Sequence, residues 1–157
     1  MTLKMAVKLV NNLWYEIIVP PPMKKLFDTT IHASAVHVCL LLLRVGSAAL
    51  MLTHGLPKLN KVINGNFQFG DPLGIGSAPS LILAVFAEVG CSLLLILGLA
   101  TRLATIPLII TMSVAAFIVH TKDPFAKQEL PLLYLLILIV LLVLGSGKYS
   151  IDSRIKR

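Results

Sequence analysis

Charged side chains are scarce in this chain of 157 residues: aspartate, glutamate, lysine and arginine together make up 13% of it, and only seven residues are acidic. Soluble domains carry about 25% charged residues, so the composition excludes an ordinary water-soluble protein. Hydrophobic residues make up 57% of the chain, and the mean hydropathy is +0.89. This balance is typical of an integral membrane protein, and the length fits one domain.

Cysteine is almost absent, with only Cys39 and Cys91, and both lie inside apolar segments. No CxxC motif or Cys/His spacing suits a metal ion, so we predict no metal site. The favoured interpretation is two small buried thiols, because free cysteine behaves as a small hydrophobe. A redox pair between the two is the alternative.

Four apolar segments are long enough to cross a membrane as helices: residues 36–53, 80–99, 103–119 and 130–144. None shows the polar alternation of a barrel strand, and only helices satisfy their own backbone hydrogen bonds in lipid. The fold class predicted is therefore an all-α integral membrane protein, a bundle of four transmembrane helices in contact with the lipid bilayer. We expect a short separate helix after Pro57, which suits the first turn of a helix.

The net charge of +7 would suggest nucleic acid as a partner for a soluble protein, but here the basic residues lie in the connections and tails, so no nucleic-acid partner is predicted. One side of the bundle would hold both termini and the second connection, with nine lysines and arginines, against four on the other. By the positive-inside rule both termini are predicted to be cytoplasmic.

Residues 1–32 differ from the rest of the chain. Apolar residues recur there at helical spacing between lysines and asparagines, which predicts an N-terminal helix lying in the headgroup region or docking a partner, ended by Pro20 to Pro22. A plain disordered tail is the alternative. A secretory signal is disfavoured, because Asn11, Asn12 and Glu16 interrupt the apolar run. The domains expected are residues 1–32, a transmembrane domain at 33–152 and a basic cytoplasmic tail at 153–157.

Arg44 lies within the first apolar segment, where an unpaired arginine would cost at least about 2.5 kcal/mol. Glu88 occupies a corresponding position in the second segment. In antiparallel neighbours the two would fall at similar depth, so the spacing predicts an ion pair between Arg44 and Glu88 that either staples the helices or marks a site. Both are therefore candidate catalytic residues.

Five further polar residues are expected near the outer interface, above that pair: His54, Lys58, His120, Glu129 and Tyr134. A quinone headgroup needs hydrogen-bond donors, a proton route and an apolar slot for its tail, and these residue types could supply them. Alternatively, the histidines only cap helix ends at the interface. A haem held by His54 and His120 is conceivable, but nothing else supports it.

The segments LLLRVGSAALMLTHGLPKL, FQFGDPLGIG, AEVGCSLLLILGLATRLATIPLIITMSVAAFIVH and ELPLLYLLILIVLLVLGSGKYSID resemble the DoxX family of bacterial membrane proteins. The resemblance covers residues 40–152. It implies a four-helix membrane bundle linked to respiratory sulfur and redox chemistry. Some relatives are described as subunits of a thiosulfate:quinone oxidoreductase, and others as membrane partners in oxidative-stress complexes.

The leading hypothesis is an inner-membrane subunit linked to quinone and respiratory electron transfer, with a protein partner or a homo-oligomer and no covalently bound cofactor. Such a chain would be the membrane subunit of a quinone-linked oxidoreductase. The alternative is a non-catalytic anchor or assembly subunit that holds a cytoplasmic partner. A small transporter or proton path is a third class, disfavoured because four helices make a thin pore.

Overall fold

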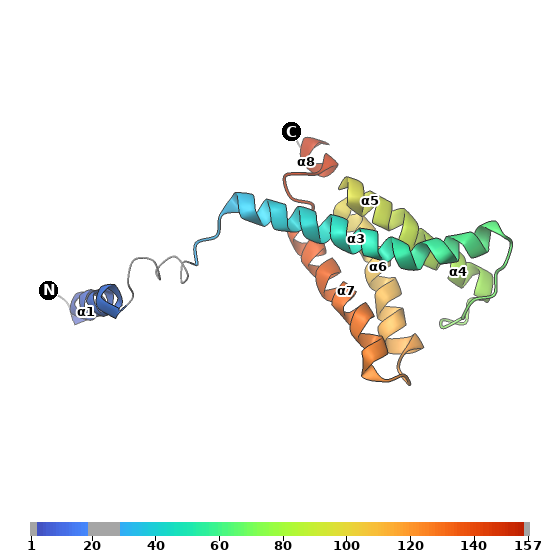
Figure 1. Cartoon of the computed structure of the whole chain (residues 1–157), viewed down its shortest axis with the longest axis horizontal. Coiled ribbons are helices and arrows are strands. Elements are labelled where there is room, and N and C mark those ends of the chain that lie inside the picture. Colours follow the sequence, from blue (N-terminus) through green and yellow to red (C-terminus); the bar gives the residue numbers. More distant parts are fainter. Residues whose placement is uncertain (1–2, 19–28, 156–157) are drawn as a thin grey trace. The chain divides into compact units, whose positions relative to one another are not determined.

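Helices account for all of the regular secondary structure in residues 3–18 and 29–155, which are the residues that the computed structural model describes (Figure 1). Within these described residues there are four candidate membrane spans, which confirms the predicted four-helix membrane bundle. They are α3 (Ala33–Ile63), the continuous run of α4 (Ser77–Val85), η1 (Phe86–Cys91) and α5 (Ser92–Leu97), the run of α6 (Thr101–Val114) and η2 (Ala115–Val119), and α7 (Phe125–Leu144).

The chain divides into two units, residues 1–32 and 33–157. In the first, α1 (Leu3–Ile18) is a helix, as the spacing of its apolar residues predicts. Its described side chains are mostly exposed, including Val10 and Trp14. Its predicted place in the headgroup region stays a prediction, and Pro20 to Pro22 lie outside the described residues.

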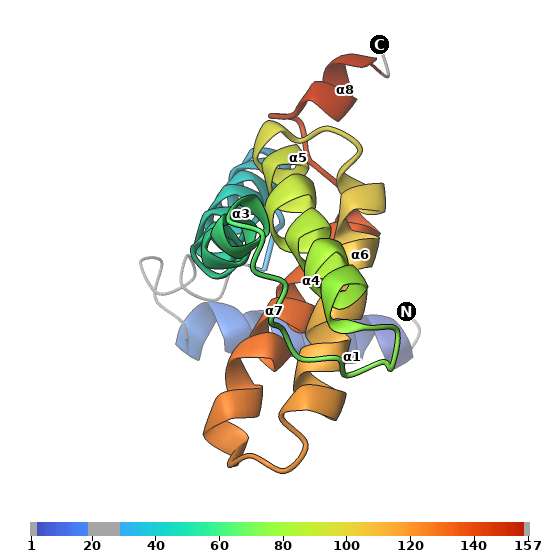
Figure 2. The same cartoon turned by 90° about the vertical axis from the view of Figure 1, so that its right-hand side faces the viewer.

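The second unit holds the four spans and the short α8 (Ile151–Ile155). Small and aliphatic side chains form its core, among them Ala48, Ala87, Cys91, Ala104 and Leu138. In Figures 1 and 2, α3 and α4 run in a different direction from α6 and α7, so the two pairs converge near α5 and α8 and diverge toward the other end. We call the diverging end, which carries the connections 64–76 and 120–124, the open end.

Helix α3 runs unbroken through Pro57 to Ile63, so the separate helix predicted after Pro57 is wrong. The true stop lies at Gly65, whose φ of 68° is left-handed and lets the amide of Asn66 donate to the carbonyl of Lys61. Gly55 instead lets α3 pack closely against η1, because a Cβ at this position would lie only 3.0 Å from the Cβ of Glu88. The helices thus approach each other closely where Gly55 meets Glu88.

The predicted ion pair between Arg44 and Glu88 is wrong for the same reason. Because α3 extends ten residues beyond Thr53, Arg44 is not at its centre, and the antiparallel register that sets Gly55 beside Glu88 sets Arg44 beside Gly98. A Cβ on Gly98 would lie 1.8 Å from Nη1 of Arg44. Arg44 is therefore about ten residues away from the level of Glu88, near the opposite end of the bundle.

Arg44 is 1% exposed and binds the turn after α7. Its Nη2 donates to the carbonyl of Tyr149 at 2.8 Å, and its Nη1 donates to that of Ser146 at 3.4 Å. Nearby, Asp152 accepts hydrogen bonds from the amides of Ala100 (2.7 Å) and Thr101 (2.9 Å). These contacts tie α3, the α5–α6 turn and the C-terminal segment together.

Burial alone would raise the pKa of Asp152, but the hydrogen bonds from the amides of Thr101 and Ala100 outweigh it and hold that pKa below its ordinary value. The carboxylate therefore stays ionised near the Arg44 guanidinium, which carries the opposite charge. Arg44 has a structural environment of backbone carbonyls and one nearby acid, which explains how an arginine is tolerated among apolar helices.

Candidate functional site

Glu88 is the most deeply buried acid of the bundle, with 1% of its surface exposed. It lies in η1, a π-helical turn from Phe86 to Cys91 within an otherwise α-helical span. Such turns insert an extra residue and occur frequently at functional sites. Oε1 of Glu88 accepts from Nζ of Lys58 on α3, whereas no partner for Oε2 lies among the described residues. A buried carboxylate oxygen without a partner is costly, so it marks a position where a ligand could donate.

Lys58 supplies the counter-charge for Glu88. Its side chain is 26% exposed, and its ammonium group also lies 5.7 Å from the centroid of the Phe69 ring, within reach of a cation–π contact. Lys58 follows Gly55 by one helical turn, and the close approach at Gly55 brings the two charges together. The ammonium group has three donors, so it can bind a further acceptor while it holds Glu88.

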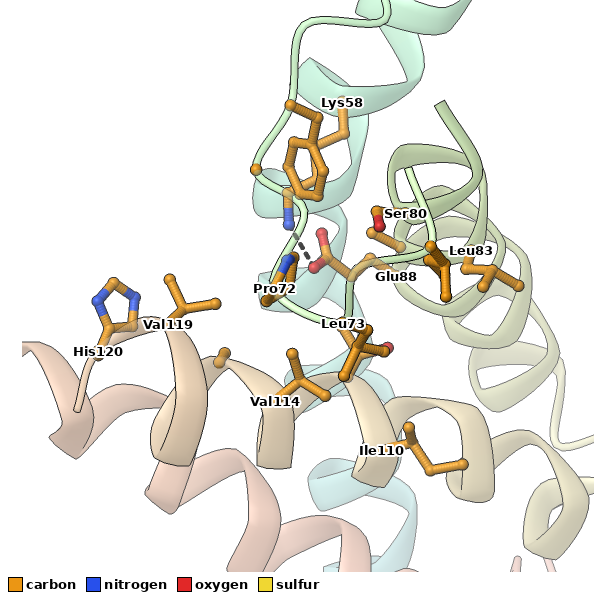
Figure 3. A pocket seen from close by; sticks show the side chains of 16 residues that line it. Lys58, Pro72, Leu73, Ser80, Leu83, Glu88, Ile110, Val114, Val119 and His120 are labelled. Atoms are coloured by element: carbon orange, nitrogen blue, oxygen red, sulfur yellow. Dashed lines mark hydrogen bonds and ion pairs between the residues drawn. The ribbon is translucent and has the colours of Figure 1, made fainter. Parts of the chain in front are cut away.

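Two cavities meet at this ion pair. The loop cavity, of about 370 Å³, lies beneath residues 69–75 and between α4 and α6. The core cavity, of about 200 Å³, lies among α3, α6 and α7. Both are lined by the same four residues: Lys58, Glu88, Ala115 and His120. In Figure 3 the side chains of Lys58 and Glu88 point toward each other, and His120 lies across the loop cavity from them.

The second π-helical turn, η2, forms the opposite wall. Ala115 begins it, and His120 directly follows its last residue. Nδ1 of His120 lies 2.7 Å from Oδ2 of Asp123, and the backbone carbonyl of His120 accepts a hydrogen bond from Nε2 of Gln128 at 2.7 Å. The hydrogen bond with His120 is the largest cause that holds the pKa of Asp123 below its ordinary value. This carboxylate orients the imidazole, which leaves Nε2 of His120 available to a ligand.

The connection over the loop cavity is held by Asp71. Its carboxylate accepts from the amides of Ile75 (2.9 Å) and Gly76 (2.8 Å) and from the hydroxyl of Ser80 (3.1 Å), just where α4 begins. The hydrogen bond from Gly76 is the largest cause that lowers the pKa of Asp71. The turn that covers the cavity is thus fastened by one charged side chain.

Acidification is expected to loosen this turn. Because the pKa of Asp71 is lowered in the folded protein, its carboxylate stabilises the turn above the ordinary pKa of about 4, and that contribution is lost as the pH falls through the lowered value. Amide hydrogen exchange at Ile75 and Gly76, corrected for intrinsic rates, should show protection that falls at acidic pH. Asp71→Asn should lose that protection already at neutral pH, whereas Asp123→Asn should keep it. Equal protection in native protein and Asp71→Asn at neutral pH would refute this role.

The structure brings most of the predicted site residues together. His54, Lys58, Glu88, His120 and Tyr134 all line the core cavity, and the rings of His54 and Tyr134 meet edge to face with centroids 6.4 Å apart. Two predicted residues lie elsewhere. Glu129 is exposed on α7 and lines neither cavity, and Arg44 lies near Gly98.

Four residues that contribute to the site were not predicted: Phe69, Asp71, Ser80 and Asp123. Asp123 could have been found from its place three residues after His120, and Asp71 from its place before a glycine-rich turn. The π-helical geometry of η1 and η2 has no sequence signal, because η2 is apolar like the helix before it and the Glu88 and Gly90 of η1 are equally compatible with an α-helix. Among the described residues, no group of three or more His, Cys, Asp or Glu could hold a metal ion. Cys39 is exposed and Cys91 buried, and both are free thiols.

Chemically, the core cavity combines a carboxylate oxygen that can accept a hydrogen bond, an ammonium group that can donate one, an oriented imidazole and a phenol, within apolar walls. Such a set can bind a flat polar headgroup at two opposed oxygens and exchange protons with it.

Comparison with known proteins is consistent with the membrane fold. The family model DoxX matches residues 39–121. A Haemophilus influenzae protein named "Uncharacterized protein" is 32% identical over 123 residues, which cover 71% of this chain and 87% of that protein. A Bacillus subtilis protein named "Putative oxidoreductase CatD" is 33% identical over 113 residues, which cover 71% of this chain and 83% of that protein. No solved structure matches the chain.

Proposed function

The chain belongs to the DoxX family, and from this premise we propose that it binds a quinone headgroup at the Lys58–Glu88 ion pair and serves as the membrane subunit of a quinone-linked oxidoreductase. The observation that carries the proposal is Oε2 of Glu88, a buried carboxylate oxygen with no hydrogen-bond partner among the described residues. It borders an apolar-walled cavity, and a hydroxyl of the reduced headgroup, the quinol, could donate to it. The name of the Bacillus subtilis relative supports a redox role.

Reduction of a quinone takes two electrons and two protons. A redox protein partner supplies the electrons in this proposal, since neither Glu88 nor Lys58 can. The ammonium group of Lys58 donates a hydrogen bond to one carbonyl oxygen of the headgroup and stabilises the negative charge that develops there. Glu88 and His120 take up the two protons from water and pass them to the headgroup oxygens, and Asp123 holds the imidazole in one orientation. The carboxylate that remains on Glu88 then accepts a hydrogen bond from a hydroxyl of the quinol.

The proposed setting is a bacterial inner membrane with both termini in the cytoplasm, based on the excess of lysines and arginines on that side. The open end, with the connections 64–76 and 120–124, then faces outward. The headgroup would sit below that surface beside Glu88, and His120 and Asp123 would relay protons from water to it.

Glu88→Gln is expected to lower quinone reduction by the complex of this chain with its partner at least about a hundredfold, which is the lower range of general acid–base effects. The amide keeps an oxygen that can accept from Lys58, so the fold should hold. Glu129→Gln is the matched control, because Glu129 is exposed and lines neither cavity. Titration of the purified protein with a tailless quinone gives the second readout. The proposal fails if native protein binds no quinone, or if Glu88→Gln reduces it as fast as Glu129→Gln.

One observation favours the non-catalytic alternative, an anchor for a cytoplasmic partner. Residues 1–32 form a unit of their own, and α1 exposes Met5, Val7, Leu9, Val10 and Trp14. Deletion of residues 1–32 separates the two functions: loss of partner capture, together with unchanged activity in every cavity variant, would favour the anchor.

A further inference from the structure

A third cavity runs along the side of the bundle between α3 and α7. This lateral groove has a volume of about 580 Å³. Its walls are almost wholly apolar, with Leu42, Leu43 and Leu50 on α3 and Leu133 and Ile137 on α7. From Cys39 to Leu50 it spans about 16 Å of helix, roughly half the thickness of a hydrocarbon core.

The lateral groove adjoins the core cavity. Tyr134 and Leu130 line both of them, and Tyr134 is only 5% exposed. The polar chamber that holds Lys58 and Glu88 therefore lies on one side of Tyr134, and the apolar channel that faces the lipid lies on the other. The polar chamber, the Tyr134 ring and the apolar channel follow one another in this order, which matches a ligand with a polar head and a long hydrocarbon tail.

We propose that the lateral groove holds the isoprenoid tail of the quinone, so that the substrate class is a long-chain quinone of the membrane and not a short water-soluble acceptor. This inference rests on the proposed function, since it assumes a headgroup at the Lys58–Glu88 ion pair. The tail lies in hydrocarbon before and after binding. The groove therefore contributes mainly a path by which the head can enter while the tail stays in lipid.

Gly46 keeps the groove open near its middle. A Cβ built on Gly46 meets no atom within 4 Å, although Gly46 lines the groove. A larger side chain there would fill the channel without a clash with the backbone. Glycine within a helix costs up to about 1 kcal/mol relative to alanine, so its replacement should not destabilise α3.

Gly46→Leu tests the inference with a pair of ligands, a benzoquinone substituted at every ring carbon that carries either a long isoprenoid tail or only methyl and methoxy groups. Gly46→Leu is expected to raise the Kd of the long-tailed quinone at least about tenfold, a steric penalty of the size that overpacking causes. The Kd of the tailless quinone should change less than about twofold. Ala49→Leu, on an exposed position of α3 that does not line the groove, should leave both unchanged.

Cys39, exposed at the far end of the groove, gives an independent readout. The long-tailed quinone should slow its alkylation by a small maleimide, the tailless quinone should not, and buried Cys91 should be protected throughout. Gly46→Leu should remove the protection given by the long-tailed quinone.

Several outcomes would overturn the inference, and they differ from failure of the proposed function. Equal Kd changes for both quinones in Gly46→Leu, or none, would show that the tail lies elsewhere while the headgroup site stands. The same conclusion would follow if Ile110→Trp, and not Gly46→Leu, weakened binding of the long-tailed quinone alone, because Ile110 borders the loop cavity. If native protein bound neither quinone, the proposed function and this inference would fall together.

Discussion

Lys58→Met is expected to lower the free energy of unfolding by about 3 kcal/mol, because it leaves both carboxylate oxygens of buried Glu88 without a partner. Breaking a buried ion pair by removal of one member costs about 3 to 5 kcal/mol, and the partial exposure of Lys58 sets the lower figure. Thermal and denaturant unfolding of the protein in detergent micelles would measure the loss.

Two further variants make the test specific. Lys61→Met removes an exposed lysine one turn further along α3 and should cost less than about 0.5 kcal/mol. Lys58→Met combined with Glu88→Met replaces the pair with apolar side chains and should regain most of the stability. If the single and double variants were equally unstable, the charge of Glu88 would not be the cause.

Gly98→Ala is expected to be the most disruptive of the small substitutions in the bundle. Its Cβ would lie 1.8 Å from Nη1 of Arg44 and 2.7 Å from the Cβ of Ser150, and the backbone at Gly98 has a φ of 68°. We expect a loss of about 2 to 5 kcal/mol, the sum of left-handed backbone strain and overpacking.

Gly65→Ala is the matched control, because Gly65 has the same φ of 68° and a Cβ there meets nothing within 4 Å. It should show only the backbone strain, about 1 to 2 kcal/mol. The difference between the two variants measures how tightly Arg44 fills the space beside Gly98. Equal losses in the two variants would contradict the position of Arg44 in the structure.

The sequence was enough to predict the four spans, because each is a long apolar run that only a helix can satisfy in lipid. It also predicted that His54, Lys58, His120 and Tyr134 would share one end of the bundle, since topology alone assigns each helix end to a side. Glu88 was expected one level below them. In the structure Glu88 instead pairs with Lys58 and belongs to the same site.

Pairing of the charges could not be predicted, because it depends on register. Register depends on where α3 ends, and Gly55 and Pro57 both suggest a stop that the structure does not make. Gly55 is used for close approach to Glu88, and the proline costs one hydrogen bond in a helix stabilised by its neighbours. The π-helical turns η1 and η2 likewise depend on packing, since neither the apolar residues of η2 nor Glu88 and Gly90 in η1 distinguish a π-helical turn from an α-helical one.

The sequence suggests that one residue, Arg44, both fastens the helices and pairs with Glu88. In the structure Arg44 has the first role and Lys58 has the second. Arg44 binds the carbonyls of Ser146 and Tyr149 and holds the C-terminal turn, where the helices converge. Lys58 balances Glu88 at the open end, where they diverge and leave the cavities. We therefore expect variants of Arg44 to affect stability and variants of Glu88 to affect ligand binding.

A density map of the full chain in lipid nanodiscs with a long-tailed quinone tests the central claim most directly. The account predicts a flat headgroup in the core cavity, within hydrogen-bond distance of Glu88 and Lys58, with tail density past Tyr134 in the lateral groove. An empty core cavity, with the quinone absent or bound at another surface, would contradict it.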